Sequence, residues 1–242
     1  LQLPGVSGER AYSMSNLPND DGVWSFMIRR VFIASIALGS VISASSQSIS
    51  ATELPQAKVL YKIDTTDKVV FLTIDDGADK PADAAAELER LQWPVTSFIL
   101  PTKIGTFATW FSGLGSRNDI ATHTARHIAL KGLSFEKQKK EICEGERRIK
   151  EKFGSTTGYF RPPYGSWDKR TLQAAAACGI SHVVLWTVSL NGRTITTWDG
   201  KIHRGNIVIA HYVGSLAQSI RQLEKRLKAQ GLTVARLSDY LK

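Results

Sequence analysis

Cysteine is nearly absent from this chain. Cys143 and Cys178 are the only two cysteines among 242 residues, and they form no C-x-x-C pair. A thiolate metal site or a dithiol redox motif is therefore not expected. Both cysteines fall in or near segments with a helical pattern, which is compatible with two buried thiols or with one disulfide. We favour buried thiols.

Clusters of Lys and Arg interleaved with aromatic residues are also missing, although the net charge is +9 and the pI about 9.6. Residues 1–46 contain equal numbers of basic and acidic residues, so the excess lies in the rest of the chain. A basic body suits a cell-wall polymer or a membrane surface, or it is simply a soluble basic surface. Without basic–aromatic clusters, nucleic-acid binding is not expected.

The chain has no apolar run of about 20 residues, the length that a membrane-spanning helix needs. Instead, Met27–Arg30 precedes an uncharged stretch over 31–43 and the small residues Ala44–Ser46. This order is typical of a secretory signal. A buried helix and an uncleaved anchor are the alternatives.

These features predict the domain organisation and the location of the protein. We expect residues 1–26 to be an upstream extension, 27–46 a signal peptide, 47–60 a polar linker and 61–242 one folded domain. The mature protein should be secreted or associated with the cell envelope, without a stable membrane span after processing. No repeat or heptad indicates an oligomer, so we expect a monomer.

The body of the chain alternates predicted strands and helices. Strands are predicted over 69–74, 95–100, 119–122, 159–161, 182–188 and 206–210. Helices are predicted over 81–91, 104–114, 134–153, 168–178 and 215–230. This alternation predicts an α/β fold with a parallel sheet and right-handed crossovers, either open or closed into a small barrel.

Charged side chains recur at or just after the ends of the predicted strands: Asp75, Asp76, His123, Arg161 and His211. Because the carboxyl ends of parallel strands meet at one edge of a sheet, these groups should share one site. Any one of the runs alone has a plainer interpretation, such as a surface turn at Asp-Asp-Gly. Their common placement favours a functional site.

Asp76, His123 and His127 are candidate metal ligands. If the chain is helical from Thr122, the two histidine rings, four residues apart, lie on one face and can bind one ion. Two imidazoles and one carboxylate leave coordination positions open for water and substrate, as in a catalytic site.

Asp75, Arg161 and His211 are candidate catalytic groups. Gly77 allows the strand to break, so that Asp75 can stay beside the metal ligands as a free base. Arg161 precedes a stiff Pro-Pro segment and can hold Asp75 ionised. His211 is a candidate general acid near neutral pH.

Four of these features together resemble the polysaccharide deacetylase family, also called carbohydrate esterase family 4 or the NodB homology domain. Thr73–Gly77 resembles the family's T-F-D-D-G, His123–His127 its H-[ST]-x-x-H, and Arg161–Gly165 its R-x-P-[YF]-G. The last strand before His211 resembles the family's closing strand and histidine. The resemblance extends over residues 69–241.

The resemblance implies a distorted (β/α) barrel of about seven parallel strands. It also implies a hydrolase of carbon–nitrogen bonds other than peptide bonds, which removes acetyl groups from a polysaccharide. Chitin oligomers and peptidoglycan are the first expected substrates, and acetylated xylan the next. The cofactor would be one divalent metal, Zn²⁺ or alternatively Co²⁺.

The resemblance also implies residue roles. Asp76, His123 and His127 would hold the metal, Asp75 would be the base, Arg161 would orient it, the backbone N–H of Tyr164 would stabilise the oxyanion, and His211 would protonate the leaving group. Trp186 and Trp198 are placed beside the substrate.

The chain departs from the family pattern in two places. The segment Leu185–Arg193 lacks the expected Asp residues, and Arg193 stands where a Trp is expected. Trp198 is our candidate replacement for this wall of the acetyl pocket. Ala78 follows Gly77 in place of the usual Pro. The altered fourth motif favours one alternative, a degenerate module that binds cell-wall glycan. A further alternative is an amidohydrolase of a small cyclic amide, against which the apparent secretory signal argues.

Overall fold

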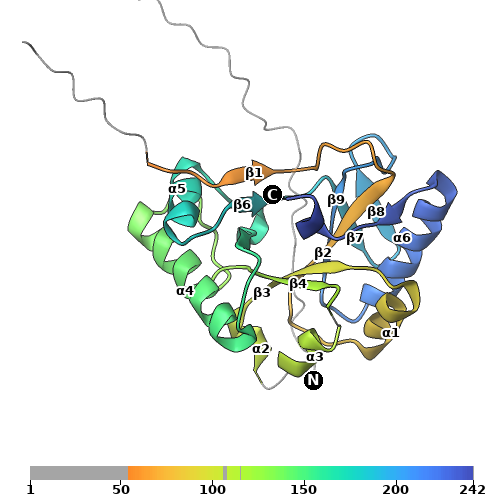
Figure 1. Cartoon of the computed structure of the whole chain (residues 1–242), viewed down its shortest axis with the longest axis horizontal. Helices are drawn as coiled ribbons and strands as arrows, with labels where there is room; N and C mark the ends of the chain where they lie inside the picture. Colours follow the sequence, from red (N-terminus) through yellow and green to blue (C-terminus); the bar gives the residue numbers. More distant parts are fainter. Residues whose placement is uncertain (1–53, 106–107, 115, 242) are drawn as a thin grey trace, which may run out of the picture. The chain divides into compact units, whose positions relative to one another are not determined.

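The structure is a computed structural model that describes residues 54–105, 108–114 and 116–241 (Figure 1). The upstream extension and the signal peptide expected over 1–46 lie outside the described residues. In the described part, no helix is both long and apolar enough to cross a membrane.

Ten strands form one curved sheet in the described part of the chain. They are β1 Lys58–Leu60, β2 Val69–Asp76, β3 Val95–Ile99, β4 Asn118–Thr122, β5 Tyr159–Phe160, β6 His182–Val184, β7 Val188–Asn191, β8 Thr194–Thr197, β9 Ile207–His211 and β10 Thr233–Val234. Their order is β1-β6-β5-β4-β3-β2-β9-β7-β8, with β10 beside β2. All pairs are parallel except β7–β8. The predicted class, a distorted (β/α) barrel in a single domain, is confirmed.

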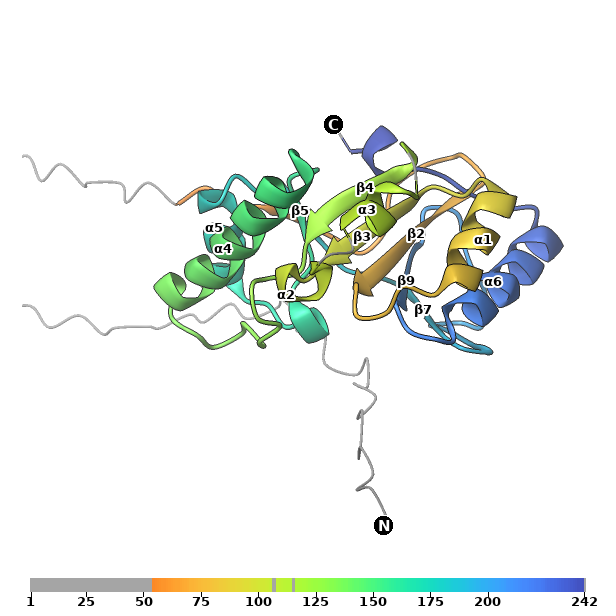
Figure 2. The same ribbon diagram turned by 90° about the horizontal axis from the view of Figure 1, so that it is seen from below.

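Six α-helices surround this sheet in the described residues: α1 Ala82–Leu91, α2 Pro101–Ile104, α3 Ala108–Ser112, α4 Phe135–Phe153, α5 Lys169–Ala177 and α6 Leu216–Gln230. The chain also has two short 3₁₀ turns in the described residues, η1 Pro163–Gly165 before α5 and η2 Leu237–Asp239 after β10. The helices α1 and α6 pack together on one side and α4 and α5 on the other (Figures 1 and 2).

Strand β2 is apolar on both faces because it lies between two layers. Val70, Leu72 and Ile74 pack in the core that includes α1 and α6, whereas Phe71 packs in a second core inside the curved sheet. Side chains alternate along a strand, so Asp75 shares the inner face with Phe71. The hydrophobic pattern of β2 therefore determines which way this carboxylate points.

The structure corrects several predicted boundaries. The strand predicted over 182–188 is two strands, β6 and β7, because the buried Arg161 side chain takes the carbonyl oxygens of Val184 and Leu185. The helix predicted over 104–114 is the separate α2 and α3. Residues 58–60, which we placed in the linker, form β1 and pair with β6.

The expectation of two buried thiols was wrong. Cys143 in α4 and Cys178 at the end of α5 form a disulfide. Helices α4 and α5 pack directly on each other, so the two cysteines meet although they are 35 residues apart in sequence. The sequence pattern gave the helices but not their contact.

We expect Cys143→Ser to lower the free energy of unfolding by about 3–4 kcal/mol. Closing a loop of this length removes that much conformational entropy from the unfolded chain. Urea denaturation of the oxidised wild type and the variant measures the difference. Addition of a reductant should destabilise the wild type by a similar amount and leave the variant unchanged. Equal stability of all samples would contradict this role.

Candidate active site

Two consecutive carboxylates, Asp75 and Asp76, end β2. A regular strand would point them to opposite faces. The strand breaks here, because Asp76 and Gly77 both have a left-handed φ of 74°. Both carboxylates consequently approach His123, with Oδ2 of Asp75 at 3.8 Å and Oδ1 of Asp76 at 3.5 Å from Nε2.

His123 and His127 lie on a loop after β4, and the helical arrangement that we considered for them does not form. Thr124 and His127 have left-handed φ values of 71° and 61°, which a helix does not allow. The hydroxyl of Thr124 accepts a hydrogen bond from the backbone N–H of His127 at 3.0 Å. This tight turn, and not helical spacing, brings the two rings within 5.0 Å of each other.

Helix α4 supports this loop through Glu141 and Gly145, which the sequence analysis did not single out. The Glu141 carboxylate accepts hydrogen bonds from the backbone and side chain of Arg126, and its carbonyl accepts one from Ala125. A Cβ at Gly145 would lie 2.6 Å from the backbone carbon of Thr124. A glycine inside a long helix was the available signal, because such a residue usually has a packing reason.

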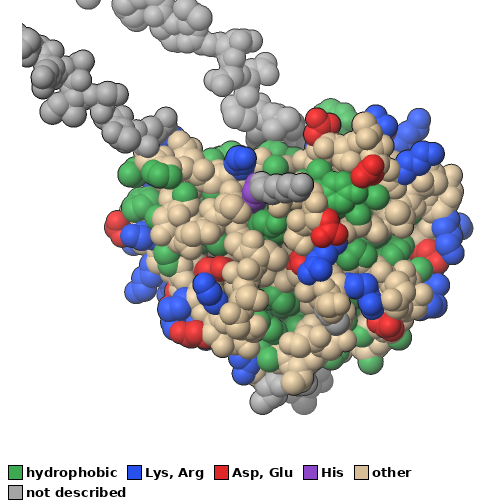
Figure 3. Space-filling model, in the orientation of Figure 1, with side chains coloured by type: hydrophobic (Ala, Val, Ile, Leu, Met, Phe, Trp, Pro, Cys, Tyr) green, Lys and Arg blue, Asp and Glu red, His purple; other side chains and the backbone are tan. Residues whose placement is uncertain are grey.

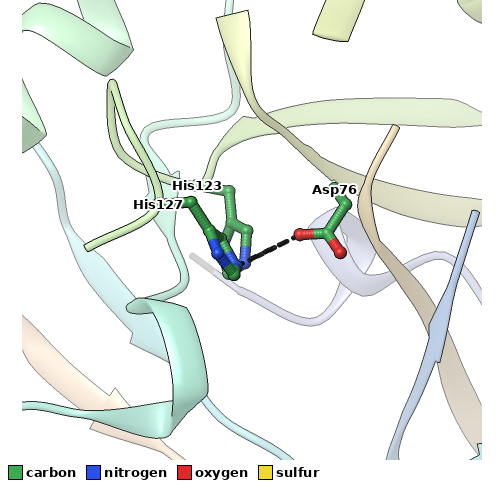
Figure 4. Close-up of side chains that lie close together, drawn as sticks. All are labelled: Asp76, His123 and His127. Carbon is green, nitrogen blue, oxygen red and sulfur yellow. Dashed lines mark ion pairs between the residues drawn. The ribbon is translucent and has the colours of Figure 1, made fainter. Parts of the chain in front are cut away.

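The side chains of Asp76, His123 and His127 converge (Figure 4), and their candidate ligand atoms all lie within 4.8 Å of one another. Nε2 of His127 is 3.3 Å from Asp76 Oδ1, and Nε2 of His123 is 3.5 Å from it. Two atoms held about 2.1 Å from one tetrahedral ion would lie about 3.4 Å apart. This spacing fits a single ion.

The protonation pattern of His123 also fits a metal ligand. Its Nδ1–H donates to the carbonyl oxygen of Arg161 at 2.7 Å, so the lone pair is on Nε2, which faces the carboxylates. Burial lowers the pKa of His123 and favours the neutral ring. Asp76 Oδ1 is buried without a hydrogen-bond donor. A buried carboxylate oxygen without a donor is well explained by a cation that it would bind.

Arg161 is fully buried and holds Asp75. Its Nη1 donates to Asp75 Oδ1 at 2.7 Å and to the Thr73 hydroxyl at 2.8 Å. Its guanidinium stacks over Phe98, with the ring centroid 4.3 Å from Cζ. The guanidinium thus fixes one oxygen of Asp75 and leaves the other facing His123.

We expect Arg161→Met to lower the free energy of unfolding by about 3–5 kcal/mol, because it leaves the buried Asp75 charge without its partner. Denaturant titration measures this change. Arg204→Met is the matched control, since Arg204 is exposed, and it should change stability by less than about 0.5 kcal/mol. Equal effects of the two substitutions would contradict the role of Arg161.

The turn η1 places Tyr164 beside His127, and Trp186 lies near the guanidinium of Arg161. Tyr164 is 65% exposed, and its ring centroid lies 4.8 Å from that of His127. Trp186 lies on the other side of the turn, where a Cβ at Gly165 would be 3.2 Å from its ring. Tyr164 and Trp186 thus lie near His127 and Arg161, and their roles toward a substrate stay predictions.

The proposed position of Trp198 in the acetyl pocket was wrong. Thr197, the residue before it, pairs with Val188 at the start of β7. Trp198 therefore lies toward the amino-terminal edge of the parallel strands, away from Asp75, and is 79% exposed. The antiparallel strand β8 carries the chain away from the site before Trp198.

His211 ends β9 directly beside Asp75, with which it pairs in the parallel ladder. Paired residues of neighbouring strands share a face, so both side chains point to the inner side of the sheet. The His211 side chain is exposed, and no carboxylate within the described ranges forms an ion pair with it. The structure thus brings the runs Thr73–Gly77, His123–His127 and Arg161–Gly165 together with His211 at one edge of the sheet. The carboxylate expected in the fourth motif, Leu185–Arg193, is absent from the sequence.

Comparisons with known proteins place this arrangement in a family. Residues 62–183 match the sequence profile named "Polysaccharide deacetylase". An uncharacterized protein of Streptomyces coelicolor is 35% identical over 191 residues, which are 76% of this chain and 77% of that protein. The peptidoglycan-N-acetylglucosamine deacetylase of Bacillus cereus is 24% identical over 205 residues, 78% of this chain and 95% of that protein.

Solved structures agree on the fold. A carbohydrate esterase family 4 pseudoenzyme of Bacillus anthracis has a TM-score of 0.66 and 20% identity, and the match covers 76% of this chain and 69% of that chain. A mutant of this pseudoenzyme with restored enzymatic activity matches with the same TM-score, 0.66. The fold alone therefore does not distinguish active from inactive members. The profile and the Streptomyces relative together show that the chain belongs to the polysaccharide deacetylase family.

Proposed function

We propose that this protein is an active, metal-dependent deacetylase of an N-acetylated polysaccharide. The observation that carries the proposal is the position of the two carboxylate oxygens of Asp75. One of its oxygens is bonded by Arg161, and the other faces the ligand cluster at 3.8 Å from His123 Nε2. A protein that only binds glycan has no need of a buried free carboxylate beside its metal ligands, whereas hydrolysis requires a base there.

Asp76, His123 and His127 would hold the metal, with Zn²⁺ or Co²⁺ as the expected ions. A divalent ion held there would act as a Lewis acid on water and on the acetyl carbonyl. Two imidazoles and one carboxylate suit such an ion and leave coordination positions open.

The residues of the chain supply the proton transfers. Asp75 Oδ2 is oriented to take the proton from the attacking water, and Arg161 holds this carboxylate in place through Oδ1. His211, on the same inner face as Asp75, would donate a proton to the departing amine. The backbone N–H of Tyr164 would stabilise the oxygen of the tetrahedral intermediate, and Trp186 would line the acetyl group.

A degenerate glycan-binding module is the second candidate. It is favoured by the missing fourth-motif carboxylate, since His211 forms no ion pair in the described part of the chain. The similarity in fold to a pseudoenzyme is compatible with it. The intact set of Asp75, Arg161 and His211 favours the enzyme.

We also propose that the mature protein acts outside the cytoplasm. The Cys143–Cys178 disulfide is typical of proteins from oxidising compartments. The sequence pattern over 27–46 provides independent support. The substrate would then be an acetylated polymer of the cell envelope or surroundings, such as peptidoglycan or chitin oligomers, with the protein acting as a monomer.

Acetate release tests the proposed activity. The purified chain is given chitooligosaccharides, peptidoglycan and acetylated xylan, first after chelation and then with added Zn²⁺ or Co²⁺. We expect metal-dependent release from at least one N-acetylated substrate. Binding of a glycan without any acetate release, in protein that contains its metal, would instead establish the binding module.

A further inference from the structure

The hairpin between β7 and β8 reaches the same edge of the sheet as the candidate active site. In the parallel ladder, Ser189 pairs with Ile209, so Asn191 is level with His211, which pairs with Asp75. Asn191 also pairs with Thr194 across the hairpin. The two residues at the tip, Gly192 and Arg193, therefore extend just beyond His211.

The tip of this hairpin is held in place by packing against α6. It is a two-residue turn whose first residue, Gly192, has a φ of 57°, as short hairpins favour. A Cβ at Gly192 would lie 3.3 Å from Oε1 of Gln218 in α6, so the turn rests on that helix. Val188 and Leu190 anchor the strand in the core shared with α6. A residue at position 193 is thus held at a defined place.

Arg193 is exposed and, within the described residues, forms no hydrogen bond or ion pair. Among the other exposed arginines, Arg90, Arg147 and Arg221 each pair with a glutamate, whereas Arg170 and Arg204 form no ion pair in the described residues. Asp79 lies on the loop after β2, where its backbone N–H donates a hydrogen bond to the carbonyl oxygen of Tyr212. Within the described residues, its carboxylate forms no ion pair with Arg193. The guanidinium of Arg193 is therefore available to a ligand.

Other basic side chains lie toward the same edge. Lys103, Lys131 and Arg170 lie in segments that directly follow β3, β4 and β5, so they start from the carboxyl ends of parallel strands. No ion pair involves them in the part of the chain that the structure describes. On the face drawn in Figure 3, by contrast, Lys and Arg are interspersed with Asp and Glu. These three side chains add unpaired positive charge to the loops at the active-site edge.

We propose that Arg193 binds a carboxylate of the substrate, so that the enzyme prefers an acidic acetylated glycan to a neutral one. This inference rests on the proposed function and specifies its substrate class. A guanidinium pairs with a carboxylate through two parallel hydrogen bonds, which adds orientation to attraction. The carboxylate belongs either to the sugar itself or to a peptide attached to it.

Steady-state acetate release by Arg193→Gln tests the proposal. The substrates are a neutral chitooligosaccharide, glycan strands of peptidoglycan with sugar carboxylates only, and the same strands with their peptides. We expect the wild type to prefer an acidic substrate. Arg193→Gln should lower kcat/KM for that substrate about 10-fold through KM, leave the neutral substrate unchanged, and be partly rescued by Arg193→Lys.

The controls separate this role from a structural one. Arg204→Gln removes an exposed arginine that precedes β9 at its opposite end, and it should have no effect on any substrate. The wild-type preference should weaken as salt rises from about 0.05 M to about 0.5 M. Comparison of strands with and without peptides identifies which carboxylate is bound.

Two results would overturn the proposal: no preference for acidic glycans in the wild type, or an equal loss on neutral and acidic substrates in Arg193→Gln. If the wild type releases no acetate, the proposed activity fails, and the same variants are compared by calorimetric affinity for the same glycans. Weaker binding of acidic glycan by Arg193→Gln alone would then support the role of Arg193. Equal affinities would overturn it.

Discussion

Asp75→Asn is expected to lower acetate release by about 10³-fold while the metal content stays at the wild-type level. Among the described residues, Asp75 is the one buried carboxylate that faces the ligand cluster without being a proposed ligand, and the amide replaces it. The Asn carbonyl can still accept the hydrogen bond from Arg161. Acetate assay and elemental analysis of the same preparation measure both effects.

Loss of folding must be excluded in this experiment, because the substitution leaves the buried Arg161 with a neutral partner. Circular dichroism and the melting temperature establish whether the variant is folded at the assay temperature. Undiminished acetate release from folded Asp75→Asn would show that Asp75 is not the base. Loss of metal together with activity would place Asp75 among the ligands.

His123→Ala is expected to weaken metal binding by at least about 100-fold and to abolish metal-dependent acetate release. The ring of His123 supplies one of three proposed ligands, with its Nε2 directed at Asp76. Loss of a residue that merely supports a ligand costs 10–100-fold in affinity, so loss of a ligand should cost no less. Competition with a metal indicator measures the affinity.

His203→Ala is the matched control for His123→Ala. His203 is exposed and pairs only with Asp199 on the loop after β8. Its replacement should leave metal affinity unchanged. Full metal occupancy in His123→Ala would remove this histidine from the ligand set.

The sequence predicted the fold because its regularities are local. The apolar run over 69–74, the N-cap at Ser134 and the helix end at Gly154 each depend on neighbouring residues, and each was confirmed. Catalytic candidates could also be found, because a parallel sheet gathers the ends of its strands at one edge. Asp75 and His211 meet there for that reason.

The remaining features depend on contacts between distant segments. The histidine loop packs on Glu141 and Gly145 of α4, so the spacing of His123 and His127 alone could not decide between a helix and a loop. The division between β6 and β7 depends on Arg161, which reaches across the inside of the sheet.

Two further errors have the same origin. The disulfide depends on the packing of α4 against α5, which no local pattern specifies. Trp198 was assigned to the site as a replacement for the missing Trp, whereas the pairing of β7 with β8 places it toward the opposite edge. Such features follow from tertiary packing, and local propensity does not determine them.

Acetate release as a function of bound metal tests the central claim most directly. Chelated protein is titrated with Zn²⁺, and bound metal and acetate release are measured at each step. We predict that activity rises in proportion to bound metal, reaches its maximum at one ion per chain, and stays at background throughout the same titration of Asp75→Asn. Equal acetate release by the metal-free chain, or none at full occupancy, would contradict a single metal site served by a free carboxylate.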